Sequence, residues 1–126
     1  RLPDAGRRVI RHLYPRRLDM SDRKIGPVSK GLIEAKKLIE NEDNWAKGYY
    51  HGVNGVLKYC LVGAVQTAFL WYKKGYNPEE YHEALRELAA ICGNDIEGFN
   101  DYYATTHSAV MSVLDAAINN ALAKGI

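Results

Sequence analysis

Residues 59–72 read YCLVGAVQTAFLWY, and this stretch decides the fold. Its apolar side chains would cover every side of a helix rather than a single stripe. A helix of that kind has to be buried among other helices. The 14 residues are too few to span a bilayer, which needs about 20. The sequence therefore predicts an all-α bundle around a buried central helix at about 57–74.

Three amphipathic segments are expected to cover the central helix, which makes a bundle of about four helices. The first segment opens with Ser29 as its N-cap. The second starts at Asn77-Pro78, where a capping side chain precedes a proline at the first helical position. Thr105 or Thr106 caps the third. The three helices are expected to end before Asn41, Gly93 and Gly125, with an irregular connection at 94–105.

A short β-hairpin is expected ahead of the central helix, at about 49–59. Asn54-Gly55 favours a type I′ turn, and aromatic and β-branched residues lie on both sides of it. A hairpin alone is only marginally stable in water. We therefore expect this one to pack against the helices.

The charge of the chain is unevenly distributed. The 126 residues carry a net charge of +2, yet residues 1–19 alone hold six arginines against two aspartates. The rest of the chain is therefore slightly acidic and lacks the basic surface that nucleic-acid binding requires. We expect contact with nucleic acid or with an anionic surface only through residues 1–19.

Residues 1–26 are interpreted as a leader ahead of a single helical domain at 27–126. One interpretation of the leader is an upstream extension that precedes a natural start at Met20. The other is a basic arm or short amphipathic helix that touches nucleic acid or anionic lipid. The apolar face of such a helix would consist of Val9, Ile10, Leu13 and Tyr14.

The cysteine content indicates a reducing compartment. Cys60 and Cys92 are too few for a disulfide framework. The chain has no apolar run of about 18 residues or more, and no secretory signal is recognised in it. We therefore expect a cytoplasmic protein without a transmembrane segment.

Short motifs follow one another in a fixed order between about residues 31 and 123. They are A-x-x-L-I, W-x-x-G, C-x-x-G-A, N-D, a threonine-rich cap and L-x-x-A-I-x-x-A, made up here of Ala35, Leu38, Ile39, Trp45, Gly48, Cys60, Gly63, Ala64, Asn100, Asp101, Thr105, Thr106, His107, Leu114, Ala117, Ile118 and Ala121. This order resembles a family of small bacterial and phage proteins known only as a domain of unknown function. The family often carries a tryptophan where Tyr59 stands. The resemblance implies a shared design and a phage or mobile-element association, but no activity.

One group of residues suggests acyl-transfer chemistry. Cys60 lies at the expected start of the central helix, and a helix N-terminus lowers the pKa of a thiol. His107 lies in the first turn of the last helix, and Asp101 precedes it. If the two helix starts share one end of the bundle, the three side chains could act as nucleophile, base and orienting acid. That arrangement would make a cysteine-dependent hydrolase or acyl transferase.

Packing is the competing interpretation, and the residue types favour it. Free cysteine is among the most buried residues, and Cys60 opens an apolar helix. His107 could form a single structural hydrogen bond, and Asn100-Asp101 could build a turn. Trp45 could anchor the core through its indole N–H. We therefore favour a protein without catalysis.

Tyrosine is the remaining signal. Nine tyrosines occur, with pairs at Tyr49-Tyr50 and Tyr102-Tyr103, and tyrosine is enriched in protein interfaces. The four histidines show no metal-binding spacing, so we expect neither a metal nor a cofactor. We expect a small interaction or regulatory protein that binds another protein or a second copy of itself. Its binding residues would be Trp45, Tyr49, Tyr50, His51, Asn100, Tyr102 and Tyr103.

Overall fold

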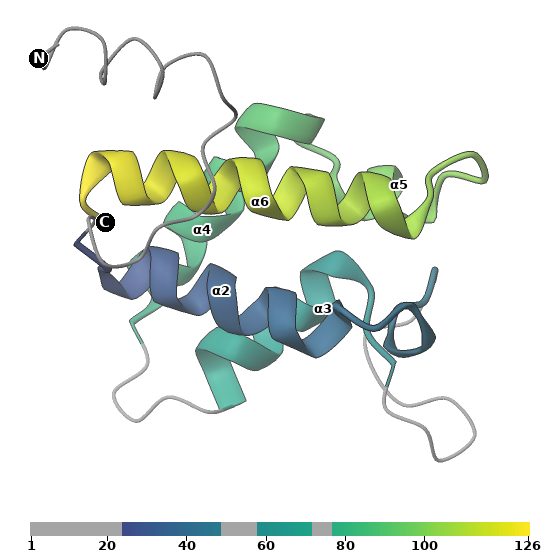
Figure 1. Cartoon of the computed structure of the whole chain (residues 1–126), viewed down its shortest axis with the longest axis horizontal. Coiled ribbons are helices and arrows are strands. Elements are labelled where there is room, and N and C mark those ends of the chain that lie inside the picture. The colour runs from purple at the N-terminus through teal and green to yellow at the C-terminus, as the bar shows by residue number, and fades with distance from the viewer. Residues whose placement is uncertain (1–23, 49–57, 72–76) are drawn as a thin grey trace, which may run out of the picture.

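The computed structural model describes residues 24–48, 58–71 and 77–126 (Figure 1). Within these ranges the chain is all-α and holds no strand. The five α-helices are α2 (Pro27–Ile39), α3 (Leu61–Gln66), α4 (Pro78–Cys92), α5 (Ile96–Asp101) and α6 (His107–Lys124). A 3-10 turn, η2 (Glu42–Asn44), follows α2, and a π-helical segment, η3 (Thr67–Trp71), continues α3. The predicted all-α class is confirmed, with about five helices instead of four.

The helices α2 and α6 lie side by side along the molecule, and α4 contacts both of them (Figure 1). The segment formed by α3 and η3 packs against α2, and α3 also contacts α4 and α5. The N-terminus of α2 and the C-terminus of α6 lie at the left-hand end of Figure 1. The C-terminus of α2, the helix α5 and the N-terminus of α6 lie at the right-hand end.

The central stretch is buried, as its composition predicts. Every residue from 61 to 65 is buried, and Ala68 and Phe69 are buried as well. The ring of Phe69 occupies the space that a side chain at Gly31 would need. The segment α3–η3 therefore meets α2 at a position where only a glycine leaves room for the ring.

The central helix begins at Leu61, later than the predicted residue 57. Tyr59 forms an isolated parallel bridge with Trp45. The Tyr59 N–H donates to the Asn44 carbonyl at 2.8 Å, and the Tyr59 carbonyl accepts from the Ala46 N–H at 3.0 Å. These bonds keep the backbone extended up to Cys60, which becomes the N-cap of the helix.

The hairpin predicted at about 49–59 is not seen. Residues 49–57, which include its turn, lie outside the described residues, as do residues 72–76 after η3. The described end of the predicted hairpin is Tyr59, whose partner is Trp45. The local turn signal did not reveal this pairing, because Trp45 lies outside the segment predicted to form the hairpin.

The connection at 94–105 was expected to be irregular, but it contains α5. The carboxylate of Asp95 accepts a hydrogen bond from the Gly98 N–H at 2.9 Å and so caps this helix. Ile96 and Asn100 are its buried residues. A six-residue helix with one buried apolar side chain has too little periodicity to be recognised in the sequence.

Most other helix ends follow local signals. Asn77 Oδ1 accepts from the Glu79 N–H at 2.9 Å, and Thr106 Oγ1 accepts from the Ala109 N–H at 3.1 Å. Gly93 and Gly125 end their helices with φ angles of 95° and 74°, which favour glycine. The predicted caps at these ends are confirmed.

The start of α2 differs from the prediction, because its N-cap is Gly26 rather than Ser29. The N–H groups of Val28 and Ser29 donate to the carbonyl of Ile126, at 2.8 and 3.2 Å. A side chain at Gly26 would overlap that carbonyl. Residue 126 therefore takes the place of a capping side chain, which local sequence cannot indicate.

Candidate functional site

A buried amide, that of Asn100, holds the right-hand end of the molecule together. Its Oδ1 accepts hydrogen bonds from Trp45 Nε1, at 2.6 Å, and from the Leu61 N–H, at 3.1 Å. Its Nδ2 donates to the Ala46 carbonyl, at 3.1 Å, and to Asp101 Oδ1, at 2.9 Å. The amide thus uses both of its donor hydrogens and both acceptor positions. It ties α5 to the first turn of α3 and to the segment after η2.

A second set of contacts ties the loop after α5 to residues 47 and 48. Asp101 Oδ1 accepts a hydrogen bond from the Gly48 N–H at 2.7 Å. Lys47 Nζ donates to the carbonyls of Tyr102 and Tyr103, at 2.6 and 3.2 Å. The ammonium group also lies 5.8 Å from the centre of the Trp45 ring. The backbone of the two tyrosines is therefore held against residues 47 and 48.

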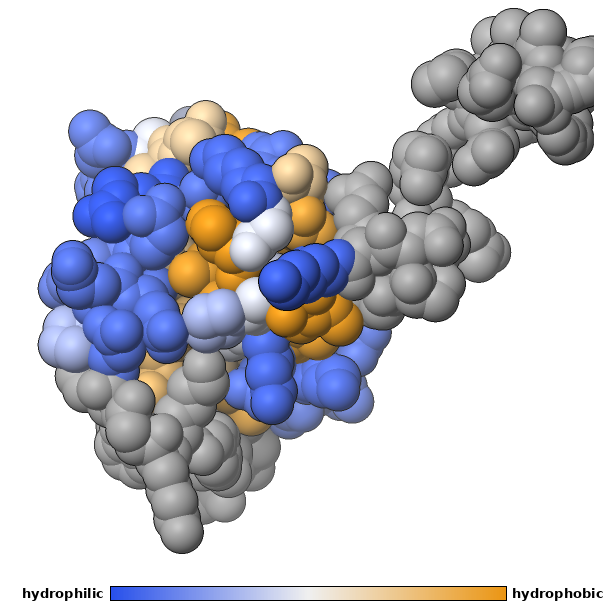
Figure 2. Space-filling view, turned by 90° about the vertical axis from the view of Figure 1, so that its left-hand side faces the viewer, coloured by the Kyte–Doolittle hydropathy of each residue, from blue (hydrophilic) through white to orange (hydrophobic). Residues whose placement is uncertain are grey.

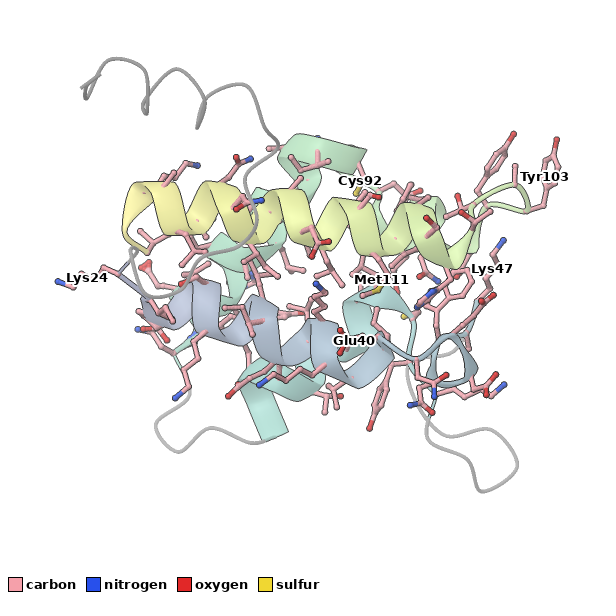
Figure 3. The ribbon with its side chains drawn as sticks, in the orientation of Figure 1. Lys24, Glu40, Lys47, Cys92, Tyr103 and Met111 are labelled. Carbon is pink, nitrogen blue, oxygen red and sulfur yellow. The ribbon has the colours of Figure 1, made fainter. Side chains whose placement is uncertain are left out.

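Tyr102 and Tyr103 lie on the surface, with 55% and 85% of their area exposed. Their ring centres are 4.7 Å apart, with the planes tilted by 50°. Figure 3 shows Tyr103 projecting outward at the right-hand end, with Lys47 at the same end. We call the surface formed by Lys47, Tyr102 and Tyr103 the tyrosine tip.

The Cys60 thiol is buried, with 4% of the residue exposed. Its Sγ accepts a hydrogen bond from the Gly63 N–H at 3.3 Å and so caps α3. Burial raises the pKa of the Cys60 thiol, and the charge of Asp101 raises it further, against the lowering effect of the backbone hydrogen bonds. A nucleophilic cysteine needs a lowered pKa, so these surroundings favour the packing role.

His107 is the first residue of α6, and its ring connects that helix to α2. Its Nε2 lies 2.7 Å from the carbonyl of Ile39, the last residue of α2. Because a carbonyl only accepts, Nε2 carries the donated proton, and the bond satisfies a carbonyl that the helix itself leaves open. The His107 ring also packs on Trp45, with ring centres 5.8 Å apart. No hydrogen bond joins either His107 nitrogen to the Cys60 sulfur, although the structure describes both residues.

The structure thus gathers most of the predicted site residues at one end of the bundle. Their contacts are those of a structural network, in which Asp101 faces the backbone of Gly48 and not the ring of His107. The catalytic role predicted for Cys60, Asp101 and His107 stays a prediction, because no hydrogen bond joins the side chain of one of these three described residues to that of another. Tyr49, Tyr50 and His51 lie outside the described residues.

Sequence reasoning did not single out Lys47 and Ala46 as part of this network. The lysine supplies three N–H donors, two of which reach main-chain carbonyls more than 50 residues away along the chain. The only signal was their position inside the W-x-x-G motif, between Trp45 and Gly48. A lysine in a short polar segment is ordinarily a solvated side chain, so nothing marked it out.

Among the described residues, no three or more His, Cys, Asp or Glu side chains lie close enough together to hold a metal ion. Over the same ranges, no helix combines the length and the apolar character needed to cross a membrane.

The raised pKa of Cys60 makes a testable prediction for its reactivity. In a Cys92→Ser protein, we expect alkylation of Cys60 to reach half its maximal rate at a pH above the ordinary thiol value of about 8.5. Burial should slow the reaction further, because the reagent reaches the sulfur only when α3 opens. The rate is followed by mass spectrometry from pH 6 to 10. A half-maximal rate well below pH 8, restored to the ordinary value by His107→Ala, would contradict the packing role.

The same shift predicts the alkaline stability of the fold. A thiol whose pKa is raised by folding keeps its proton longer in the folded chain than in the unfolded chain. The free energy of unfolding should therefore be unaffected below the unfolded pKa of about 8.5 and should fall as the pH rises above it. Urea unfolding between pH 7 and 10, with Cys60→Ala as the control, isolates this contribution. An equal slope in both proteins would contradict it.

Comparison with known proteins finds a matching family. Residues 25–120 match the sequence model of DUF6197, a family of unknown function. No curated protein and no solved structure gives a match to the chain. Of the polar residues that carried the resemblance in the sequence, Trp45, Cys60, Asn100, Asp101, Thr106 and His107 form the network and the helix caps, whereas Thr105 contributes a backbone hydrogen bond to Tyr102. The motifs therefore describe how the fold is held together.

Proposed function

The chain belongs to the DUF6197 family. We propose that this member is a small, non-catalytic protein-binding module that contacts its partner through the tyrosine tip. The observation that carries the proposal is the exposure of two adjacent, mutually packed tyrosines at 55% and 85%. Tyrosine and tryptophan dominate the residues that contribute most to binding energy in protein interfaces.

The exposed rings contribute little to the stability of the fold. A large ring that is mostly solvated gains almost none of the free energy that burial would provide. The core of the bundle is complete without Tyr102 and Tyr103, since neither belongs to it. An exposed aromatic pair of this kind gains stabilisation when a second molecule covers it.

The tip is also held in one arrangement, which favours binding. The ammonium of Lys47 fixes both tyrosine carbonyls, and the carboxylate of Asp101 fixes the Gly48 N–H. The Asn100 amide, which contacts Asp101, has no unused hydrogen-bonding position. A preorganised surface loses less conformational entropy on association, so more of the contact energy becomes affinity.

A cytoplasmic location is part of the proposal. Cys60 and Cys92 are both free thiols, which fits a reducing compartment. A partner in that compartment is therefore expected, either a different protein or a second copy of this chain.

The test compares wild-type protein with the double variant Tyr102→Ser/Tyr103→Ser. Truncating one dominant aromatic costs about 2 kcal/mol or more of binding free energy, so we expect the double variant to bind its partner at least about 100-fold more weakly. Sedimentation over a concentration series measures self-association, and quantitative capture from extracts of the source cells measures binding to other proteins. Because both side chains are exposed, unfolding should change by no more than about 0.5 kcal/mol.

The matched control is Ile91→Ser, which removes an exposed apolar side chain, 40% exposed, from the end of α4. This variant should keep every association that wild type shows. Associations that survive the tyrosine substitutions, or that disappear equally in the Ile91 variant, would rule out the tyrosine tip as the contact surface.

A further inference from the structure

The backbone of the tyrosine tip has unused N–H donors beside the two exposed rings. The Thr105 N–H donates to the Tyr102 carbonyl at 2.9 Å and closes a turn. Tyr103 and Ala104 are the central residues of this turn, so its closing bond uses neither of their N–H groups. Within the described ranges, no protein group accepts a hydrogen bond from either of them. The carbonyls of Tyr102 and Tyr103, in contrast, are engaged by Lys47, so a ligand that approaches the rings meets free donors.

The charges beside the turn are of opposite sign. The Lys47 ammonium is bonded to the tyrosine carbonyls, and the Asp101 carboxylate is bonded to the N–H of the next residue, Gly48, at 2.7 Å. An anionic ligand would be attracted by the lysine and repelled by the aspartate. Neutral acceptors, such as the carbonyls of a peptide, therefore suit these donors better than a phosphate or a carboxylate does.

The opposite end of the molecule also carries apolar surface, framed by hydrophilic residues (Figure 2). A groove of about 470 Å³ lies there, with Pro27, Val28 and Ile126 as its apolar lining. The Lys124 ammonium beside it is already bonded to the Glu87 carboxylate at 2.7 Å. None of the described residues that line this groove is aromatic. It is therefore a different kind of surface, and it provides a control for the tip.

We propose that the tyrosine tip recognises a proline-rich segment in the polyproline II conformation. This inference rests on the proposed function and names the class of partner. Proline has no N–H, and the carbonyls of a polyproline II helix form no internal hydrogen bonds. Such a segment is therefore rich in free acceptors and poor in donors, which complements the free N–H groups of Tyr103 and Ala104.

The rings complete the match. The Tyr102 and Tyr103 rings, 4.7 Å apart and tilted by 50°, form an angled aromatic surface for pyrrolidine rings. Their hydroxyl groups can donate to further carbonyls of the segment. A polyproline II segment is already extended before it binds, so it loses little conformational entropy on aromatic surfaces of this kind.

Other peptide conformations fit the tip less well. A strand that adds to a sheet needs an extended edge, and the described residues form no strand. An amphipathic helix satisfies its carbonyls within its own backbone, so it would cover the Tyr103 and Ala104 N–H groups without accepting from them. Donors covered in this way cost free energy instead of contributing to binding.

The test titrates fluorescently labelled decaproline with the full chain and follows fluorescence anisotropy. We expect saturable binding that Tyr102→Ser/Tyr103→Ser weakens at least about 100-fold, since each lost aromatic anchor costs about tenfold or more. The matched control is Ile25→Ser, which removes a 44% exposed apolar side chain at the opposite end and should bind like wild type. A labelled Gly-Ser peptide of the same length, flexible and with an N–H at every residue, should not bind.

Two-dimensional ¹H–¹⁵N NMR of the decaproline titration identifies the donors. The Tyr103 and Ala104 N–H signals should move downfield as they donate to proline carbonyls. The Thr105 N–H, already bonded to the Tyr102 carbonyl, should move less.

Equal binding of the two peptides, equal binding by the double tyrosine variant, or no binding of decaproline would overturn the proline-rich assignment. This failure differs from a failure of the proposed function. A cellular partner that is lost from the double tyrosine variant, while decaproline does not bind, would leave the tip as the contact surface and exclude this class of partner.

Discussion

Replacing Asn100 by alanine should lower the free energy of unfolding by about 3 to 5 kcal/mol, because it leaves one buried and two partly buried polar groups without partners at once. The Trp45 indole N–H, the Leu61 N–H and the Ala46 carbonyl all lose the amide group that satisfies them. Each buried group left unpaired costs about 1 to 3 kcal/mol, less where water can enter. Since small domains are stable by only about 5 to 15 kcal/mol, the variant should be close to unfolding at 37 °C.

Urea unfolding followed by circular dichroism measures the loss, and a second substitution tests its cause. Trp45→Phe removes the indole N–H and should cost about 1 kcal/mol in wild type. In the Asn100→Ala background it removes a donor that no longer has a partner, so it should be neutral or stabilising. Asn94→Ala, at an exposed position, should change stability by less than about 0.5 kcal/mol. A loss below about 1 kcal/mol for Asn100→Ala would mean that the amide does not hold this end together.

Replacing Phe69 by alanine should also cost about 3 to 5 kcal/mol, because the ring is fully buried between η3 and α2 and leaves a cavity. The contact with Gly31 makes a sharper prediction. Gly31→Ala in wild type should cost about 1 to 3 kcal/mol, since the added methyl group would overlap the Phe69 ring in a packed core. In the Phe69→Ala background the same substitution should become stabilising by about 0.5 to 1 kcal/mol, the ordinary preference for alanine within a helix.

The reversal of sign is what identifies the contact, and a double-mutant cycle on urea unfolding measures it. Lys30→Ala, on the exposed side of the same helix, should have the same small effect in both backgrounds. If Gly31→Ala destabilises both proteins equally, the glycine is required for a reason other than the ring of Phe69.

The polar network explains why some site residues were predictable and others were not. Trp45, Asn100, Asp101 and His107 stood out because their types are unusual in the segments where they occur. What each of them contacts could not be inferred, since the partners lie far away in the sequence. The hydrogen bond from Trp45 to Asn100 spans 55 residues, and the one from His107 to Ile39 spans 68. Spacing along the chain carries no information about such pairs.

The sequence by itself determined the helices whose signals are local. Asn77 and Thr106 cap the helices that follow them, and Gly93 and Gly125 end theirs, because each of these interactions closes within three or four residues. It also determined that residues 61–65 and 67–69 lie in the interior, because a helix that is apolar on nearly every side has little surface to present to water.

Only the tertiary structure decided the rest. It placed residue 126 at the start of α2, extended the backbone up to Cys60, and made α5 a helix around a buried amide. It also decided that the Cys60 thiol is a buried cap, because the neighbouring helices remove it from water and Asp101 opposes its ionisation. These outcomes depend on which backbone and side-chain groups must find hydrogen-bond partners once the core has closed. That requirement exists only in the folded chain.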